Sequence, residues 1–151
     1  MSKRPSKEQY YLNIAKAVSK RSPCLRRHYG CIIVKDDEII ATGYNGSPRG
    51  GINCCDVGFC HRENMPHNCG DYSECCSVHA EQNAMLSASR REMLGATMYL
   101  YGEEMQKENL FWVGATEAWY YIDAIPCPIC TRMIKNSGIV KVVNRRGEVC
   151  L

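Results

Sequence analysis

Four residues of this 151-residue chain have the types and spacing of a catalytic zinc site. His79 and Glu81 share a His-Ala-Glu motif, and Cys127 and Cys130 share a later Pro-Cys-Pro-Ile-Cys motif. Zinc prefers four tetrahedral ligands, and a site with only three protein ligands keeps its fourth position open for water. We therefore predict that His79, Cys127 and Cys130 bind a catalytic zinc ion.

Glu81 lies two residues after the histidine, where it can transfer protons without binding the metal. Zinc lowers the pKa of its bound water to roughly 7, so hydroxide is available at neutral pH. On an aminopyrimidine, that hydroxide would attack the carbon that bears the amino group. Glu81 would carry the proton to the adjacent ring nitrogen and then to the departing ammonia. This order of motifs is typical of zinc nucleobase deaminases. A structural zinc or a redox Cys pair is the alternative, but it would leave Glu81 without a role.

The composition fits one globular domain over residues 1–151 that is free of membrane segments. A net charge of +3 is too small to indicate nucleic-acid binding. The N-terminal residues lack the apolar core of a signal peptide, so we expect a cytoplasmic protein. Without export, the 11 cysteines favour metal binding over a disulfide framework.

Hydrophobic periodicity and turn residues predict the elements that position the four residues. We expect helices over 5–22, 78–91 and 128–136, and strands over 30–34, 38–43, 96–101, 118–122 and 139–143. The segment 102–117 is polar and mixed, which favours a loop. Pro128 suits the first turn of a helix, which places Cys127 just before that helix and Cys130 inside it. Alternating strands and helices predict an α/β sandwich with helices covering a mixed sheet.

Two irregular segments flank the predicted site. Residues 43–51 contain four glycines and a proline, so they form either a plain turn or a loop that approaches a ligand. In that loop the amide of Asn45 suits a sugar hydroxyl. Residues 52–78 form a Cys-rich insert without helical or strand periodicity. A metal cross-link would stabilise this insert, and a flexible loop with free thiols is the alternative.

The chain resembles the deoxycytidylate (dCMP) deaminases of the cytidine deaminase-like superfamily. The zinc motifs are shared by the whole superfamily, whereas the Gly-Tyr-Asn-Gly-Ser-Pro loop and the Cys-containing insert point to dCMP. The resemblance implies a three-layer αβα fold with a mixed five-stranded sheet, hydrolysis of dCMP to dUMP and ammonia, and a homo-oligomer, either a hexamer or a dimer. It also links Gly43, Tyr44 and Gly46 to regulation by dCTP and dTTP. The segment 102–118 is longer than the usual link.

The resemblance further implies a second, structural zinc whose ligands include Cys24 and Cys54. Cys60 and Cys75 are our choice for the remaining ligands, and Cys69, Cys76 and His67 are rivals. Five residues are predicted to contact substrate, the arginines as partners for its phosphate: Asn45, Ala80, Arg26, Arg27 and Arg49. A tyrosine is expected to stack on the base, and four are candidates: Tyr44, Tyr101, Tyr120 and Tyr121.

Other activities share this zinc chemistry. A tRNA adenosine deaminase would need a broad basic face for the RNA backbone, which a net charge of +3 does not suggest. Free cytidine and dCTP are other substrates of similar shape. A deaminase-like zinc protein of the competence-operon type would lack catalysis, and the intact Glu81 opposes that interpretation.

Overall fold

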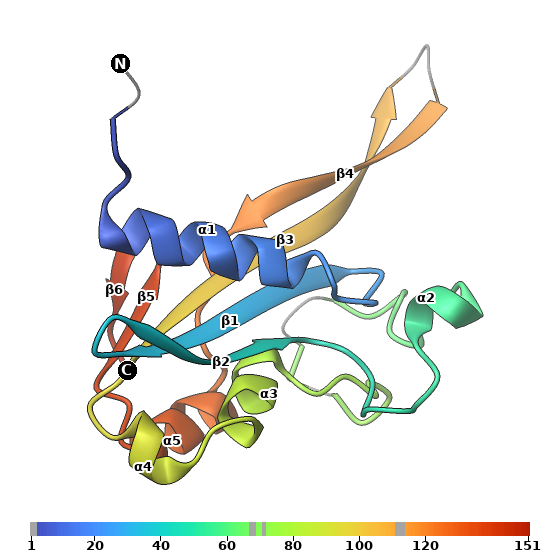
Figure 1. Ribbon diagram of the computed structural model, residues 1–151. Coiled ribbons are helices and arrows are strands. Elements are labelled where there is room, and N and C mark those ends of the chain that lie inside the picture. The colour runs from blue at the N-terminus through green and yellow to red at the C-terminus, as the bar shows by residue number, and fades with distance from the viewer. Residues whose placement is uncertain (1–2, 67–68, 71, 111–113) are drawn as a thin grey trace.

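A six-stranded mixed sheet forms the middle layer of this computed structural model, which describes residues 3–66, 69–70, 72–110 and 114–151. Helices cover both of its faces (Figure 1). The elements follow one another as α1 (Lys7–Ser19), β1 (Arg27–Lys35), β2 (Glu38–Tyr44), α2 (Cys54–Val57), α3 (Ala80–Leu86), α4 (Arg90–Met93), β3 (Thr97–Leu110), β4 (Gly114–Ile122), α5 (Pro128–Ser137), β5 (Lys141–Asn144) and β6 (Gly147–Val149). The predicted three-layer α/β fold is confirmed.

The strand order is β2-β1-β3-β5-β6, and β4 pairs with the second half of β3. β1 is antiparallel to both β2 and β3, whereas β3 and β5 run parallel. Residues 30–34 of β1 are all buried, as expected for a strand that is covered on both faces. The centre of the sheet is therefore formed by β1 and β3, and the strands predicted over 30–34 and 38–43 form an antiparallel pair.

Helix α1 alone covers one face of the sheet. Ser6 caps its first turn by accepting a hydrogen bond from the backbone N–H of Gln9. Tyr11 and Ala15 are buried against apolar side chains of the central strands. The helix approaches β1 so closely that a Cβ on Gly30 would lie 1.9 Å from the carbonyl oxygen of Ala15. Glycine at this position is therefore required by packing.

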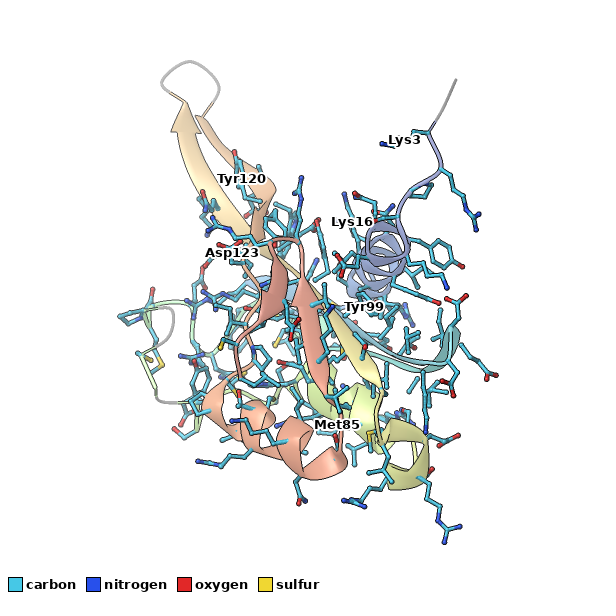
Figure 2. The ribbon with its side chains drawn as sticks, turned by 90° about the vertical axis from the view of Figure 1, so that its left-hand side faces the viewer. Lys3, Lys16, Met85, Tyr99, Tyr120 and Asp123 are labelled. Carbon is cyan, nitrogen blue, oxygen red and sulfur yellow. The ribbon has the colours of Figure 1, made fainter. Side chains whose placement is uncertain are left out.

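Helices α3, α4 and α5 cover the opposite face. Figure 2 shows Lys16 and Tyr99 on the α1 side of the sheet and Met85 among the helices of the other side. A Cβ on Gly43 of β2 would lie 2.3 Å from the carbonyl oxygen of Ala80, so α3 lies directly on the sheet. This close contact fixes the start of α3, where His79 and Glu81 are found.

The prediction of a loop over 102–117 is wrong. β3 continues through this segment to Leu110 and pairs with β4 in an antiparallel ribbon from Gly102↔Ile122 to Leu110↔Gly114. The ribbon projects beyond the rest of the sheet (Figure 1), and Gln106, Lys107 and Glu117 are exposed on it. Because these residues beyond the base of the ribbon are polar and exposed, the sequence there lacks the alternation that identifies strands.

Three other boundaries differ from the predictions. The helix expected over 78–91 is two helices, because Ser89 caps a new start at α4. The strand predicted over 118–122 begins earlier, at Gly114, and β6 adds a sixth strand to the five predicted. In the described part of the 52–78 insert, α2 is the one helix and a bridge between Gly46 and Val78 the one β pairing. No helix in the described ranges is long and apolar enough to span a membrane.

Candidate active site

Two helices begin at the predicted zinc site. His79 is the N-cap of α3, and its backbone N–H donates to Gln82 Oε1 at 3.1 Å. Cys127 is the N-cap of α5, and its Sγ accepts a hydrogen bond from the backbone N–H of Cys130 at 3.4 Å. Pro128 occupies the first turn, as predicted. Because helix N-termini carry partial positive charge, the starts of α3 and α5 direct that charge toward the predicted zinc site.

The three predicted ligands meet at one point. His79 Nδ1 lies 3.4 Å from Cys130 Sγ and 3.6 Å from Cys127 Sγ, and all three donor atoms lie within 4.8 Å of one another. Zinc–nitrogen and zinc–sulfur bonds of about 2.0 and 2.3 Å would place tetrahedral nitrogen and sulfur ligands about 3.6 Å apart. The donor atoms therefore fit a zinc ion with one position left for a non-protein ligand.

Burial tunes the protonation of these ligands. It lowers the pKa of His79, which favours the neutral imidazole that binds metal. Burial, and next the charge of Glu81, raise the pKa of the Cys130 thiol. A divalent cation between the two thiols would reverse that effect, since a ligating thiol loses its proton. The site is therefore electrostatically satisfied when it holds a cation.

Glu81 lies in the first turn of α3 and is only 6% exposed. Its burial raises its pKa to about 7. Its charge in turn raises the pKa values of Cys130 and of Cys31 on β1, so the carboxyl group lies between the metal ligands and the sheet. It is not part of the cluster of metal-binding atoms. A carboxyl group with a pKa near neutrality is well suited to proton transfer.

Asn45 is buried next to β1 and holds that strand in place. Its Oδ1 accepts from the backbone N–H of Tyr29 at 2.8 Å, and its Nδ2 donates to the carbonyl of Arg27 at 2.9 Å. Since a side-chain amide carries two N–H donors, one further donor is left for a ligand. Ala80 is fully buried at the start of α3, between the histidine and the glutamate.

The three predicted phosphate-binding arginines have three different surroundings. Arg26 donates to the backbone carbonyls of Arg62 and Met65, so it anchors the Cys-rich insert. Arg49 is exposed and donates to the hydroxyl of Ser87 at the far end of α3. Arg27 is largely buried at the start of β1, beside Tyr29. The structure brings only Arg27 of the three near the strand that contacts Glu81.

The sequence reasoning missed Tyr29. Arg27, Tyr29 and Cys31 alternate along β1 and share the face that packs against α3 and α5. Burial raises the pKa of Tyr29, Arg27 opposes that rise, and the charge of Glu81 adds to it, so the phenol lies near the Glu81 carboxyl group. The signal was present in the sequence, because side chains two residues apart on a strand point the same way.

The predicted stacking tyrosines are distributed over both faces. Tyr101 packs against α1, and the rings of Tyr101 and Tyr121 lie 5.6 Å apart. Both therefore lie across the sheet from the zinc ligands. Tyr120 is exposed on the ribbon, and Tyr44 is exposed at the end of β2. Neither of the α1-facing tyrosines is in position to stack on a substrate at the zinc.

The loop predicted to bind effectors borders a large open groove that also reaches Arg26, Arg49 and the ribbon. Tyr44 lines this groove, and its backbone carbonyl accepts a hydrogen bond from Asn83 Nδ2 at 2.7 Å. Gly43 is held against α3, and Gly46 pairs with Val78. Packing thus accounts for both glycines.

The cysteines proposed for a second metal gather at another point. A cavity of about 20 Å³ beside the Gly-rich loop is lined by all four of them and by three further groups that could bind metal: Cys24, Cys54, Cys60, Cys75, Cys76, His61 and Glu74. Their donor atoms are not drawn together as closely as those of the first site, which is the one such cluster among the described residues. Cys69 is not part of this lining, and His67 lies outside the described residues.

Comparison with known proteins gives one consistent family. The model of the cytidine and deoxycytidylate deaminase zinc-binding region matches residues 5–145. A deoxycytidylate deaminase of Mycobacterium phage D29 is 35% identical over 146 residues, which cover 93% of this chain and 94% of that protein. One from Schizosaccharomyces pombe is 36% identical over 141 residues, 93% of this chain but 37% of that protein.

Among solved structures, the dCMP deaminase of cyanophage S-TIM5 in complex with dCMP and dUMP is similar. It has a TM-score of 0.59 and 26% sequence identity, covering 95% of this chain and 83% of that one. The family match includes both motifs that carry His79, Glu81, Cys127 and Cys130. With its fold and its zinc-binding geometry, the chain therefore belongs to the cytidine and deoxycytidylate deaminase family.

Proposed function

We propose that this chain catalyses the hydrolytic deamination of dCMP to dUMP and ammonia. The observation that carries the proposal is the cluster of His79, Cys127 and Cys130 next to a buried glutamate with a pKa of about 7. The choice of substrate is supported by the deoxycytidylate deaminase of phage D29, which matches this chain over 94% of its own length. It is further supported by the similar cyanophage enzyme, which was solved with dCMP and dUMP.

A zinc ion held by the three ligands would supply a Lewis acid that makes water nucleophilic at neutral pH. The protein's own contribution is proton transfer by Glu81. Its carboxylate accepts a proton from the attacking water and delivers it to the ring nitrogen beside the amino-bearing carbon. The same carboxylate then takes the proton of the hydroxyl now on that carbon and delivers it to the amino group, so that the carbon–nitrogen bond breaks, ammonia departs and the ring carbonyl forms. Burial keeps bulk water away from this carboxyl group, so the proton passes to the substrate.

Binding of the nucleotide falls to residues on β1 and the Gly-rich loop. Asn45 has one amide donor beyond those that hold the strand, and that donor suits a sugar hydroxyl. Arg27 is our choice for the phosphate, because Arg26 is engaged by the Cys-rich insert and Arg49 lies at the far end of α3. The aromatic surface around the base stays unassigned to a particular tyrosine.

We also propose a structural zinc in the cysteine-lined cavity, bound by Cys24, Cys54, Cys60 and Cys75. The support is that one small cavity gathers residues from both ends of the insert and from the segment before β1. Cys54→Ser should lower the zinc content by about one ion per chain and loosen the insert, while Cys150→Ser at the exposed C-terminus should retain both ions. Full metal content in Cys54→Ser would exclude this site.

A homo-oligomer and control by dCTP and dTTP complete the proposal. The groove beside Tyr44 is open enough to accept a nucleotide, and its lining contains Lys20, Arg26 and Arg49. Sedimentation of the zinc-loaded protein measures the oligomer, and ammonia release from dCMP with and without each nucleotide measures the control. A monomer under all conditions would reject the oligomer.

The activity itself is tested by following ammonia release from the purified, zinc-loaded protein. The substrates are dCMP, dCTP, deoxycytidine, CMP and a tRNA anticodon stem. We expect the highest kcat/KM for dCMP. Turnover restricted to the tRNA stem would move the protein to RNA modification, and no turnover of any cytosine substrate would reject the proposed function.

A further inference from the structure

Tyr29 lies between the catalytic glutamate and the arginine that we assign to the phosphate. Cys31 on β1 lies near enough to Glu81 for the charge of that carboxylate to raise the pKa of its thiol. Tyr29 precedes Cys31 by two residues, and Arg27 precedes Tyr29 by two. Alternate residues of a strand are about 6.6 Å apart, so these three side chains extend about 13 Å along one face. That face therefore leads from the reacting end of the site to the phosphate-binding end.

The position of the Tyr29 ring is fixed by the neighbouring strand. Tyr29 pairs with Gly102 of β3, and a Cβ on that glycine would lie 2.7 Å from Tyr29 Cε1. The ring therefore lies directly over the glycine backbone and cannot sink toward the sheet. Ile122 of β4 closes the far side of the same glycine. Because apolar contacts fix the position of the ring, the hydroxyl is not needed to hold Tyr29 in place.

The hydroxyl of Tyr29 accepts a hydrogen bond from Arg27 Nη1 at 3.3 Å. Among the described residues, no group accepts the hydroxyl's own proton. Arg27 is oriented from its other side by Glu104, whose Oε1 lies 3.4 Å from Arg27 Nη2. The guanidinium of Arg27 is a planar fork of five N–H donors with a permanent positive charge, so it attracts an anion placed beside the Tyr29 hydroxyl.

We propose that Tyr29 donates its hydroxyl proton to a phosphate oxygen of the nucleotide, beside Arg27, and so makes the site selective for a nucleoside monophosphate over the nucleoside. This inference rests on the proposed function for the identity of the base. Tyr29 is a substrate-binding residue and takes no part in proton transfer at the ring. Glu104 is a positioning residue in this proposal, because its ion pair with Arg27 orients the guanidinium.

Calorimetry of the zinc-loaded protein with dCMP and with deoxycytidine tests this assignment in wild type and Tyr29→Phe. Phenylalanine keeps the ring over Gly102 and removes only the hydroxyl. A hydrogen bond to a charged group lost in this way weakens dCMP binding by about 10-fold or more and leaves deoxycytidine binding unchanged. Tyr10→Phe, on the exposed face of α1, is the matched control and should bind both compounds as the wild type does.

Steady-state kinetics give the second measurement. KM for dCMP should rise by about the same factor while kcat is preserved, because the contact is made equally in the ground state and the transition state. Equal losses for dCMP and deoxycytidine, or no loss for either, would overturn the assignment. If the wild type binds dCMP without deaminating it, the proposed function fails, while the binding comparison still decides the role of Tyr29.

Discussion

Replacing Glu81 with glutamine should lower activity and raise the stability of the metal-free protein at the same time. The two side chains have the same shape, so the packing at the start of α3 is preserved. Glutamine cannot carry the proton from water to the ring nitrogen. It also removes a negative charge from a residue that is only 6% exposed. Among the described residues, Glu81 has no ion-pair partner. The same burial that equips the carboxyl group for catalysis destabilises the fold.

The loss of activity follows from the number of proton transfers that one carboxylate performs. A positioned general acid or base contributes typically about 10²- to 10⁴-fold to the rate. Since Glu81 acts both in the attack and in the departure of ammonia, we expect turnover to fall by about 10³-fold or more. Zinc content should be unchanged, because Glu81 is not among the clustered metal-binding atoms.

The gain in stability follows from the pKa. A carboxyl group whose pKa rises from 4.5 to about 7 on folding opposes folding wherever it is ionised. Below pH 4.5 both states bind the proton and the penalty is absent. It grows as the pH rises toward 7 and reaches about 3 kcal/mol at pH 8. Glu81→Gln should therefore be more stable than the wild type by about 3 kcal/mol at pH 8 and by less than about 1 kcal/mol at pH 5.

The assay is urea unfolding of chelator-treated wild type and variant at both pH values, with ammonia release measured on zinc-loaded samples. Glu117→Gln, on the exposed part of the ribbon, is a control for the loss of one negative charge. Equal stabilities at pH 8 would refute the inference that the carboxylate is buried without compensation. A variant that retains turnover within about 10-fold of the wild type would refute its role in proton transfer.

Two further predictions concern packing and charge. Gly43→Ala would place a Cβ 2.3 Å from the carbonyl oxygen of Ala80 and 2.4 Å from the backbone nitrogen of Ala84, so α3 must move. We expect about 1–3 kcal/mol of destabilisation in thermal unfolding, together with reduced zinc content. Full retention of zinc would contradict the packing argument. Burial raises the pKa of Glu103, but hydrogen bonds from the Lys20 ammonium and the Tyr101 hydroxyl lower it by more than burial raises it. The pKa of Glu103 in the folded protein is therefore depressed. The stabilisation is therefore complete above the unfolded pKa of 4.5 and is lost as the pH falls through the lower pKa of the folded state. Glu103→Gln should destabilise the protein to urea at pH 7 but by less at pH 3, and a pH-independent difference would refute the ion pair.

The zinc-binding residues were predictable because local rules place them. A proline in the first turn sets the start of α5, which forces Cys127 and Cys130 onto one helix end. His79 precedes α3 in the same way. Each helix start arranges the residues of its own motif, so the remaining prediction was that the two helix starts lie close together. The three donor atoms within 4.8 Å of one another match that prediction.

The ribbon and the faces of the tyrosines were not predictable by the same rules. An antiparallel ribbon exposed on both sides is specified by cross-strand pairing, which leaves no hydrophobic period in either strand. Because the segment 102–117 was taken as a loop, the register of β3 with β4 was unknown. That register decides that Tyr121 lies opposite Glu103 and faces α1. The stacking candidates could therefore not be separated from the sequence.

The arginines show how one missed strand affects the assignment of a binding site. Arg26 and Arg27 are adjacent and equally charged, yet Arg26 binds the Cys-rich insert whereas Arg27 contacts the continuation of β3 past Gly102. It brings Glu104 to Arg27 and supplies the glycine on which Tyr29 lies. If these two side chains bind the phosphate, the base of the ribbon is part of the substrate site. The segment that was predicted to be a long loop then also positions the residues that select the nucleotide.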